Sequence, residues 1–141
     1  MWNYMWPILI VVGANTLYNI CAKAIPDTIN PFASLSITYV IAALLSFSLF
    51  FISSPQKNFI AEASKANWSS FALGAAIIGL EFGYICIYRA GWKISTGSLV
   101  ANLSLACVLL VIGLIAYKES LSIKQISGIF VCMAGLFLIC K

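Results

Sequence analysis

The sequence predicts an all-α membrane protein that forms a single transmembrane domain over residues 1–141. Of the 141 residues, 62% are hydrophobic and 9% are charged, whereas a soluble domain is about 45–50% apolar and about 25% charged. A soluble fold of this length has too little interior to hide so much apolar surface. Five apolar segments alternate with polar connections, and because lipid cannot satisfy the backbone of open strands, we expect these segments to be five transmembrane helices.

Each apolar segment approaches the roughly 20 residues that a helix needs to cross a bilayer. The segments lie at about residues 7–24, 32–52, 71–88, 98–117 and 123–140. No Lys or Arg precedes the first apolar run, so we interpret it as a retained span and not as a signal peptide. The short connection "YKESLS" predicts that the last two helices form a tight antiparallel pair. We expect a multi-pass protein of the inner cell membrane.

Positive charge is distributed evenly between the two sides of this topology. Five spans place the termini on opposite sides of the membrane, and cytoplasmic loops normally carry the excess of Lys and Arg. One side carries Lys57, Lys65, Lys118 and Lys124, and the other carries Lys23, Arg89, Lys93 and Lys141. One interpretation is that this positive-inside rule predicts the orientation poorly here, because Lys23 and Arg89 lie at helix ends. The other is that copies of the chain insert in both orientations and pair antiparallel.

The composition argues against several classes of function. The chain has no His and its five Cys form no CxxC pair, so we expect no metal site, no disulfide framework and no cofactor. Lys and Arg occur singly or in loose pairs, whereas nucleic-acid binding needs a clustered basic surface. The sequence has no nucleophile–His arrangement and no phosphate-binding loop, so it does not predict an enzyme.

Glu81 lies just past the middle of the third apolar segment, where a carboxylate costs about 2.5–3.5 kcal/mol on insertion scales. At helical spacing it shares a face with Gly74, Ile77, Tyr84 and Tyr88. One hypothesis is that Glu81 binds a cation or couples transport to a proton. The alternative is that Glu81 forms a hydrogen bond that holds two helices together.

Polar residues also share one face of the first segment, where Asn15, Tyr18 and Asn19 recur at helical spacing. These amides and this phenol either line a binding site or form interhelical hydrogen bonds, which contribute only about 0.6–2 kcal/mol each in membranes. In the fourth segment Ser98 and Asn102 share a face and extend the candidate site.

The fifth segment carries a stripe of small residues at helical spacing, Gly128, Cys132 and Gly135. Small residues let two helix backbones approach closely in a membrane. We therefore expect this stripe to be a packing surface, within the chain or between two copies of it.

The turn after the fourth segment contains Lys118, Glu119 and Leu121, and Gly128 and Gly135 follow in the last segment. With this pattern the C-terminal half resembles an EamA-type repeat of the drug/metabolite transporter superfamily. The first segment, with its Asn-containing face and Lys23, is similar to the first helix of small multidrug resistance proteins. In that group a Glu in the middle of this helix binds cations and protons, but the corresponding position here is Asn15, which cannot titrate.

The resemblance implies an architecture. Most EamA-type proteins carry two inverted five-helix repeats, and this chain has one, so an antiparallel homodimer would complete ten helices. Inverted repeats place the substrate near the midplane at their interface. The expected binding residues are Asn15, Tyr18, Asn19, Glu81, Tyr84, Tyr88, Ser98 and Asn102.

We therefore expect a secondary transporter that moves a small metabolite or amphipathic solute by alternating access. Glu81 is the candidate coupling residue. Two alternatives remain open at this point: a proton-coupled exporter of cationic drugs, and a non-transporting membrane subunit that serves as a scaffold for a partner chain.

Overall fold

The computed structural model describes residues 2–54, 58–118 and 122–140, and at residues 2–4, 123–126, 129, 136, 139 and 140 it describes the backbone alone. Within these ranges the chain forms six helices and no strand. Four positions used above, Lys57, Glu119, Leu121 and Lys141, lie outside the described residues, as does the side chain of Lys124.

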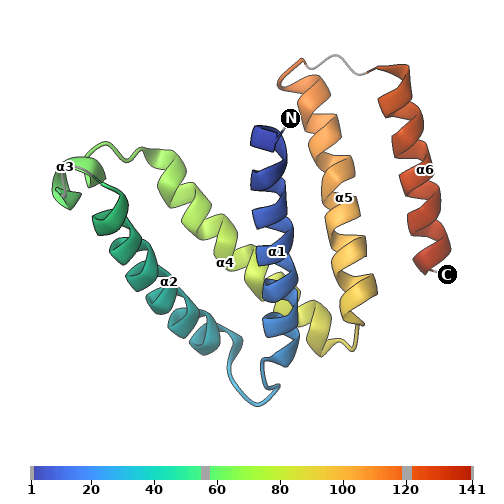
Figure 1. Cartoon of the computed structure of the whole chain (residues 1–141). Helices are drawn as coiled ribbons and strands as arrows, with labels where there is room; N and C mark the ends of the chain where they lie inside the picture. The colour runs from blue at the N-terminus through green and yellow to red at the C-terminus, as the bar shows by residue number, and fades with distance from the viewer. Residues whose placement is uncertain (1, 55–57, 119–121, 141) are drawn as a thin grey trace. The chain divides into compact units, whose positions relative to one another are not determined.

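Five of the described helices are long (Figure 1): α1 (Trp2–Ala24), α2 (Pro31–Ser53), α4 (Trp68–Arg89), α5 (Ile94–Ile115) and α6 (Ile123–Cys140). In the part of the chain that the structure describes, α1, α2, α4 and α5 are long and apolar enough to cross a membrane, and they overlap the first four predicted spans. They indicate a multi-pass membrane protein. The fifth span, at α6, stays a prediction.

Three of these helices begin three or more residues before the start predicted from the apolar segments. The observed starts are Trp2, Trp68 and Ile94, where the hydrophobic runs predicted residues 7, 71 and 98. The reason at α4 is a cap: the Asn67 side chain accepts a hydrogen bond from the backbone N–H of Ser69 at 3.0 Å. This bond satisfies one of the donors that the first turn of a helix leaves unpaired, so the helix extends into the polar loop.

The same loop contains a short helix that the sequence analysis did not predict, α3 (Phe59–Ala63). Its cap is Asn58, whose side chain accepts a hydrogen bond from the backbone N–H of Ala61 at 3.2 Å. The ring of Phe59 packs edge-on against Phe47 and Phe50 of α2, with centroids 5.0 and 5.6 Å apart. A capped turn and three aromatic rings therefore fold this loop back onto the end of α2.

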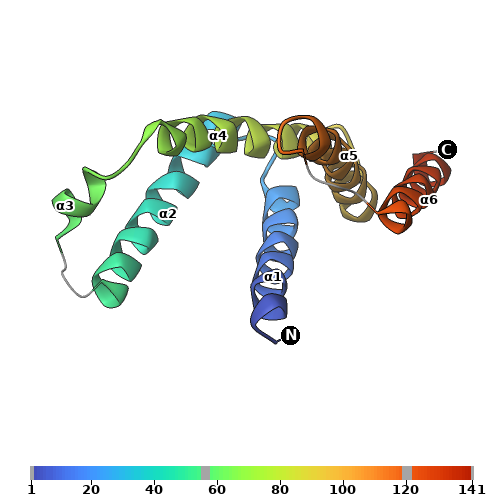
Figure 2. The ribbon, with the colours of Figure 1, turned by 90° about the horizontal axis from the view of Figure 1, so that it is seen from above.

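The chain divides into two compact units, residues 1–90 with α1 to α4 and residues 91–141 with α5 and α6. In the first unit α4 packs against both α1 and α2, and in the second α5 packs against α6. Where α2 meets α4, Phe32 stacks on Phe82 with ring centroids 4.9 Å apart. From this contact the two helices separate toward α3 (Figure 2).

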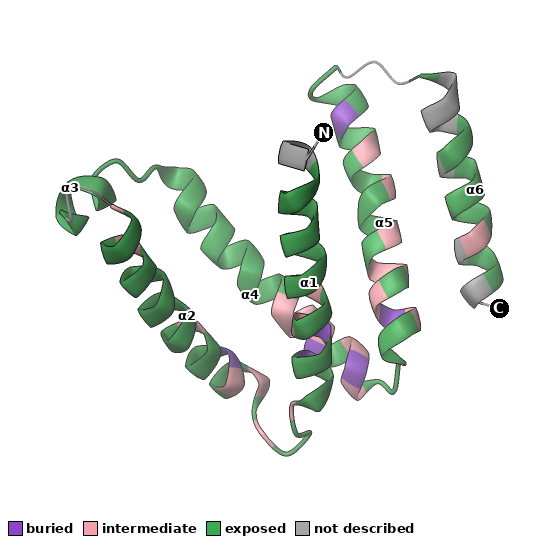
Figure 3. Cartoon of the chain, in the orientation of Figure 1, coloured by how far each residue is buried: buried purple, intermediate pink, exposed green. Residues whose placement is uncertain are grey.

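Burial in the first unit is concentrated at one place. Most large apolar side chains are exposed, as expected for surfaces that face lipid or another chain. The buried residues of the unit are Asn19, Ala22, Leu35, Ile85 and Tyr88. Asn19, Ala22, Ile85 and Tyr88 lie where α1 meets α4. Figure 3 shows buried stretches of both helices there. The best-packed part of the unit therefore surrounds two polar side chains from the predicted site.

Candidate functional site

Asn19 of α1 and Tyr88 of α4 form a buried pair at the helix crossing, each 4% exposed. The Tyr88 hydroxyl donates a hydrogen bond to the side-chain oxygen of Asn19. The Asn19 amide nitrogen in turn donates to the backbone oxygen of Asn15 at 2.7 Å and to its side-chain oxygen at 2.8 Å. Because buried polar groups in lipid need partners, this chain of bonds fixes the crossing of α1 and α4.

Two more tyrosines continue the cluster away from this pair. The ring of Tyr18 meets that of Tyr84 edge-on, with ring centroids 5.4 Å apart. The ring centroids of Tyr84 and Tyr88 are 6.1 Å apart. The Tyr18 hydroxyl is buried, and it has no hydrogen-bond partner among the described residues. An unpaired buried hydroxyl is unfavourable unless a molecule outside the chain fills the place.

Glu81 of α4 is the acid whose charge acts on this unpaired hydroxyl. Its carboxylate is close enough to interact electrostatically with the phenols of Tyr18 and of Tyr39 from α2. The Tyr39 hydroxyl is also buried and also lacks a partner within the described chain. Three helices thus contribute one acid and two unsatisfied hydroxyls that interact electrostatically. Such a set can orient a ligand that carries hydrogen-bonding or positively charged groups.

Tyr39 is not among the site residues predicted from the sequence. Its signal was a single phenol in the interior of the apolar segment 32–52. Five other hydroxyls of α2 donate to carbonyls of their own helix, those of Ser36, Thr38, Ser46, Ser48 and Ser53. Ser36, for example, donates to the Phe32 carbonyl at 2.8 Å. Such bonds satisfy a hydroxyl without a neighbour, so Tyr39 differs from them in needing an external partner.

Comparison with known families decides which class of protein carries this site. The model of the EamA-like transporter family matches residues 3–141, nearly the whole chain. The chain belongs to the EamA-like transporter family. The predicted resemblance to the drug/metabolite transporter superfamily is confirmed. Neither the comparison with curated proteins nor the comparison with solved structures finds a match.

Membership places this EamA-like protein among membrane transporters of small solutes, a family that does not consist of enzymes.

Ser98 and Asn102, the predicted site residues of α5, belong to the second unit. There the Asn102 amide donates to the Ser98 carbonyl at 2.8 Å and to the Ser98 hydroxyl at 3.1 Å. The two share a face of α5, and their contribution to the site stays a prediction.

The small-residue stripe of α6 is open in the described part of this EamA-like chain. A methyl group built on Gly128 or Gly135 would meet no atom within 4 Å, and Cys132 is exposed. The stripe therefore has room for a neighbouring helix, and its role as a packing surface stays a prediction.

At the opposite end of α4 from α3, Arg89 holds the connection between α1 and α2. Its guanidinium nitrogen Nη2 donates to the carbonyls of Pro26 at 3.1 Å and Ile29 at 2.6 Å. Its Nε lies 3.6 Å from a carboxylate oxygen of Asp27. The Lys23 ammonium donates to the Tyr88 carbonyl at 3.2 Å. Backbone carbonyls have no sequence signature, so this anchoring could not be predicted.

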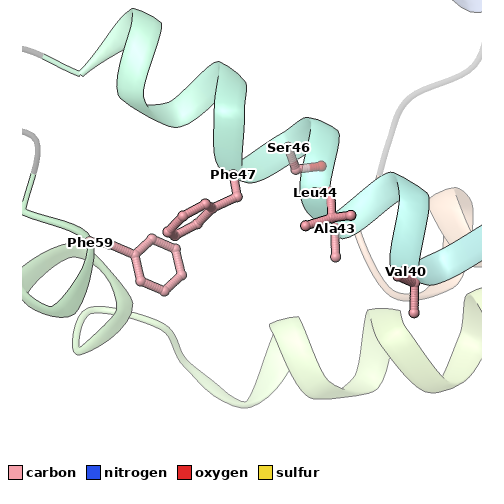
Figure 4. A pocket seen from close by; sticks show the side chains of 6 residues that line it. All are labelled: Val40, Ala43, Leu44, Ser46, Phe47 and Phe59. Carbon is pink, nitrogen blue, oxygen red and sulfur yellow. The ribbon is translucent and has the colours of Figure 1, made fainter.

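Two cavities in the first unit differ in character. An apolar groove of about 490 Å³ runs along α2 to α3 (Figure 4) and is lined by Val40, Ala43, Leu44, Ser46, Phe47 and Phe59. Its one hydroxyl, that of Ser46, is already bonded within α2, so the groove cannot orient a polar solute. A second cavity, of about 230 Å³, lies beside Lys23, Asp27 and Arg89.

Proposed function

We propose that this EamA-like protein is a secondary transporter subunit that moves a small metabolite or amphipathic solute by alternating access. The observation that supports the proposal most is the pair of buried hydroxyls, on Tyr18 and Tyr39, that lack hydrogen-bond partners in the described chain and interact electrostatically with Glu81. Unsatisfied donors at span depth are costly, and a solute that accepts their hydrogen bonds during its passage would remove that cost.

The solute would be held by two kinds of contact. The phenols of Tyr18 and Tyr39 supply hydrogen bonds, and the edge-on rings of Tyr18 and Tyr84 supply an aromatic wall. Such a combination suits a molecule with an apolar body and a few polar groups. Asn19 and Tyr88 satisfy each other, so they would fix the wall of the site while the other residues contact the solute.

A second candidate is the export of organic cations coupled to protons. A specific feature favours it: in the part of the chain that is described, the Glu81 carboxylate has no ion-pair partner, and its charge acts on the phenols of Tyr18 and Tyr39. A carboxylate and tyrosine faces together attract a cation. The scaffold role for a partner chain is the outcome that remains if neither solute class is transported.

We expect uptake of at least one small solute into proteoliposomes that contain the purified chain. The double variant Tyr18→Phe, Tyr39→Phe should lower that uptake about tenfold to thirtyfold, because each hydroxyl donor is worth about 1 kcal/mol. Its thermal stability should stay near that of the wild type, because no hydrogen bond of the described chain is lost. Initial rates and thermal unfolding curves measure the two effects.

Tyr117→Phe is the matched control, because its phenol is 76% exposed just beyond α5, and it should leave uptake unchanged. If the wild-type chain moves no member of a broad panel of amino acids, sugars, nucleosides and organic cations, with or without a pH gradient, the transporter proposal fails and the scaffold role stands.

The working unit would be an antiparallel dimer of two copies. Two arguments support it: the four-to-four balance of positive charge, and a family in which two inverted repeats commonly form one transporter. A C-terminal tag should therefore be found on both sides of the membrane in comparable amounts, as measured by protease accessibility in sealed vesicles. Lys93→Gln, which leaves three charges against four, should shift the distribution toward one side. A wild-type tag confined to one side would eliminate the antiparallel homodimer.

A further inference from the structure

The polar cavity of about 230 Å³ lies where two spans end. It is lined by the last turn of α1, the connection between α1 and α2, and the last turn of α4. Its volume is about eight times the roughly 30 Å³ that one water molecule occupies in the liquid. Span ends lie at the membrane–water interface, which is also the depth of lipid phosphates. Polar groups from lipid or from solution can both reach such a place.

The charges around this cavity favour an anion. Lys23 and Arg89 contribute two positive charges and Asp27 contributes one negative charge. The Asp27 carboxylate lies 3.6 Å from the Arg89 Nε, which is longer than a hydrogen bond, and its side chain is 83% exposed. Asp27 therefore pairs with Arg89 without a hydrogen bond. The residues that line the cavity keep a net charge of +1.

The donors of the cavity are also incompletely used. Arg89 is held in place by the carbonyls of Pro26 and Ile29 through Nη2, while its Nε is buried and has no hydrogen-bond partner among the residues that the structure describes. A buried guanidinium N–H is strongly favoured to find an acceptor, and oxyanions accept from Arg in a fixed geometry. The positioned guanidinium therefore keeps a donor without a hydrogen bond among the described residues, and its ion-pair partner Asp27, at 3.6 Å, lies beyond hydrogen-bond distance.

From the cavity, its net charge and this donor, we infer that the Lys23–Arg89 cavity binds a singly charged oxyanion, a phosphate or a carboxylate, at the end of α1 and α4. The group is either the phosphate of an anionic lipid or a free anion from solution. This site is separate from the cluster of Tyr18, Tyr39 and Glu81, so it can exist whether or not the proposed transport activity does.

The test uses the full chain in nanodiscs of phosphatidylcholine with a minor fraction of phosphatidylglycerol. Native mass spectrometry should find phosphatidylglycerol retained on the protein above its share of the bilayer. Lys23→Gln should lower this retention about tenfold, because a charge-assisted contact is lost. Asp27→Asn should raise it several-fold, because the competing carboxylate is removed. Lys65→Gln, an exposed lysine of another loop, is the control for net charge and should change nothing.

Inorganic phosphate distinguishes the two sources. If titrated phosphate displaces the retained lipid, the site also takes free anions from solution, and if it does not, the site is specific for the headgroup. The inference is overturned if phosphatidylglycerol is not enriched and titrated phosphate does not bind the chain either, or if Lys23→Gln and Lys65→Gln reduce retention equally. Lys23 also bonds to the end of α4, so Lys23→Gln removes a structural contact as well as a charge. Asp27→Asn provides an independent test, because the Asp27 side chain is exposed. Unchanged or weaker retention of the lipid in this variant also overturns the inference.

Discussion

Replacing Glu81 by Gln is expected to lower solute uptake about tenfold to a hundredfold and to remove its dependence on a pH gradient. Gln keeps the size and hydrogen-bonding capacity of the side chain but cannot take up or release a proton. A contact to a charged group is worth about 1.5–3 kcal/mol, and each 1.4 kcal/mol changes a rate or affinity about tenfold. Uptake into proteoliposomes, at equal pH on both sides and under an imposed gradient, measures both effects.

Glu62→Gln is the matched control, because Glu62 carries the same functional group in α3 but is exposed and paired with Lys65 at 2.7 Å. This variant should behave as the wild type. Gradient-dependent uptake that persists unchanged in Glu81→Gln would contradict a coupling role for the carboxylate. Unchanged uptake of organic cations would contradict the cation-export alternative as well, and Glu81 would then be left with a role in helix packing.

The long helices could be predicted because their cause is local. Each apolar segment excludes water along its own length and must satisfy its own backbone, and both properties are visible in a window of about 20 residues. The residues at which the helices begin were harder to predict, because hydropathy ignores caps such as Asn67. The helix α3 was missed for the same reason: it depends on the Asn58 cap and on Phe59 reaching the rings of α2.

The candidate site was predictable to the extent that one helix face defines it. The faces carrying Asn15, Tyr18 and Asn19 and carrying Glu81, Tyr84 and Tyr88 follow from helical spacing, and the structure brings the two helices together at these residues. Tyr39 could not be assigned in this way, because its importance depends on how α2 approaches Glu81. The partners of Arg89 are backbone carbonyls, which exist at every residue and become specific only through the fold.

The cluster also separates into two kinds of polar residue that the sequence presents alike. Asn15, Asn19 and Tyr88 satisfy one another, whereas the hydroxyls of Tyr18 and Tyr39 find no partner in the chain as described. Satisfied buried groups rigidify a structure, and unsatisfied ones need a ligand or water. The two groups should therefore respond differently to substitution, the first in stability and the second in transport.

Asn19→Leu is accordingly expected to reduce the free energy of unfolding by about 1–3 kcal/mol, the cost of leaving a buried hydroxyl without a partner. Leu keeps the number and branching of the side-chain heavy atoms, so the loss falls on the Tyr88 hydroxyl and on the Asn15 oxygens that Asn19 bonds. Reversible unfolding of the purified chain in mixed micelles measures the change. Asn102→Leu is the control: Asn102 is exposed and bonds within its own helix, and its substitution should cost no more than about 0.5 kcal/mol.

A double-mutant cycle with Tyr88→Phe decides whether the pair is the cause. Tyr88→Phe removes the hydroxyl that Asn19→Leu leaves unpaired, so the double variant should be more stable than the sum of the two single changes predicts. The expected coupling energy is about 0.6–1.7 kcal/mol, the range found for interhelical hydrogen bonds in membranes. Strict additivity would show that Asn19 and Tyr88 do not stabilise the crossing through each other. The more direct interpretation would then be that both residues contact the solute, together with Tyr18 and Tyr39.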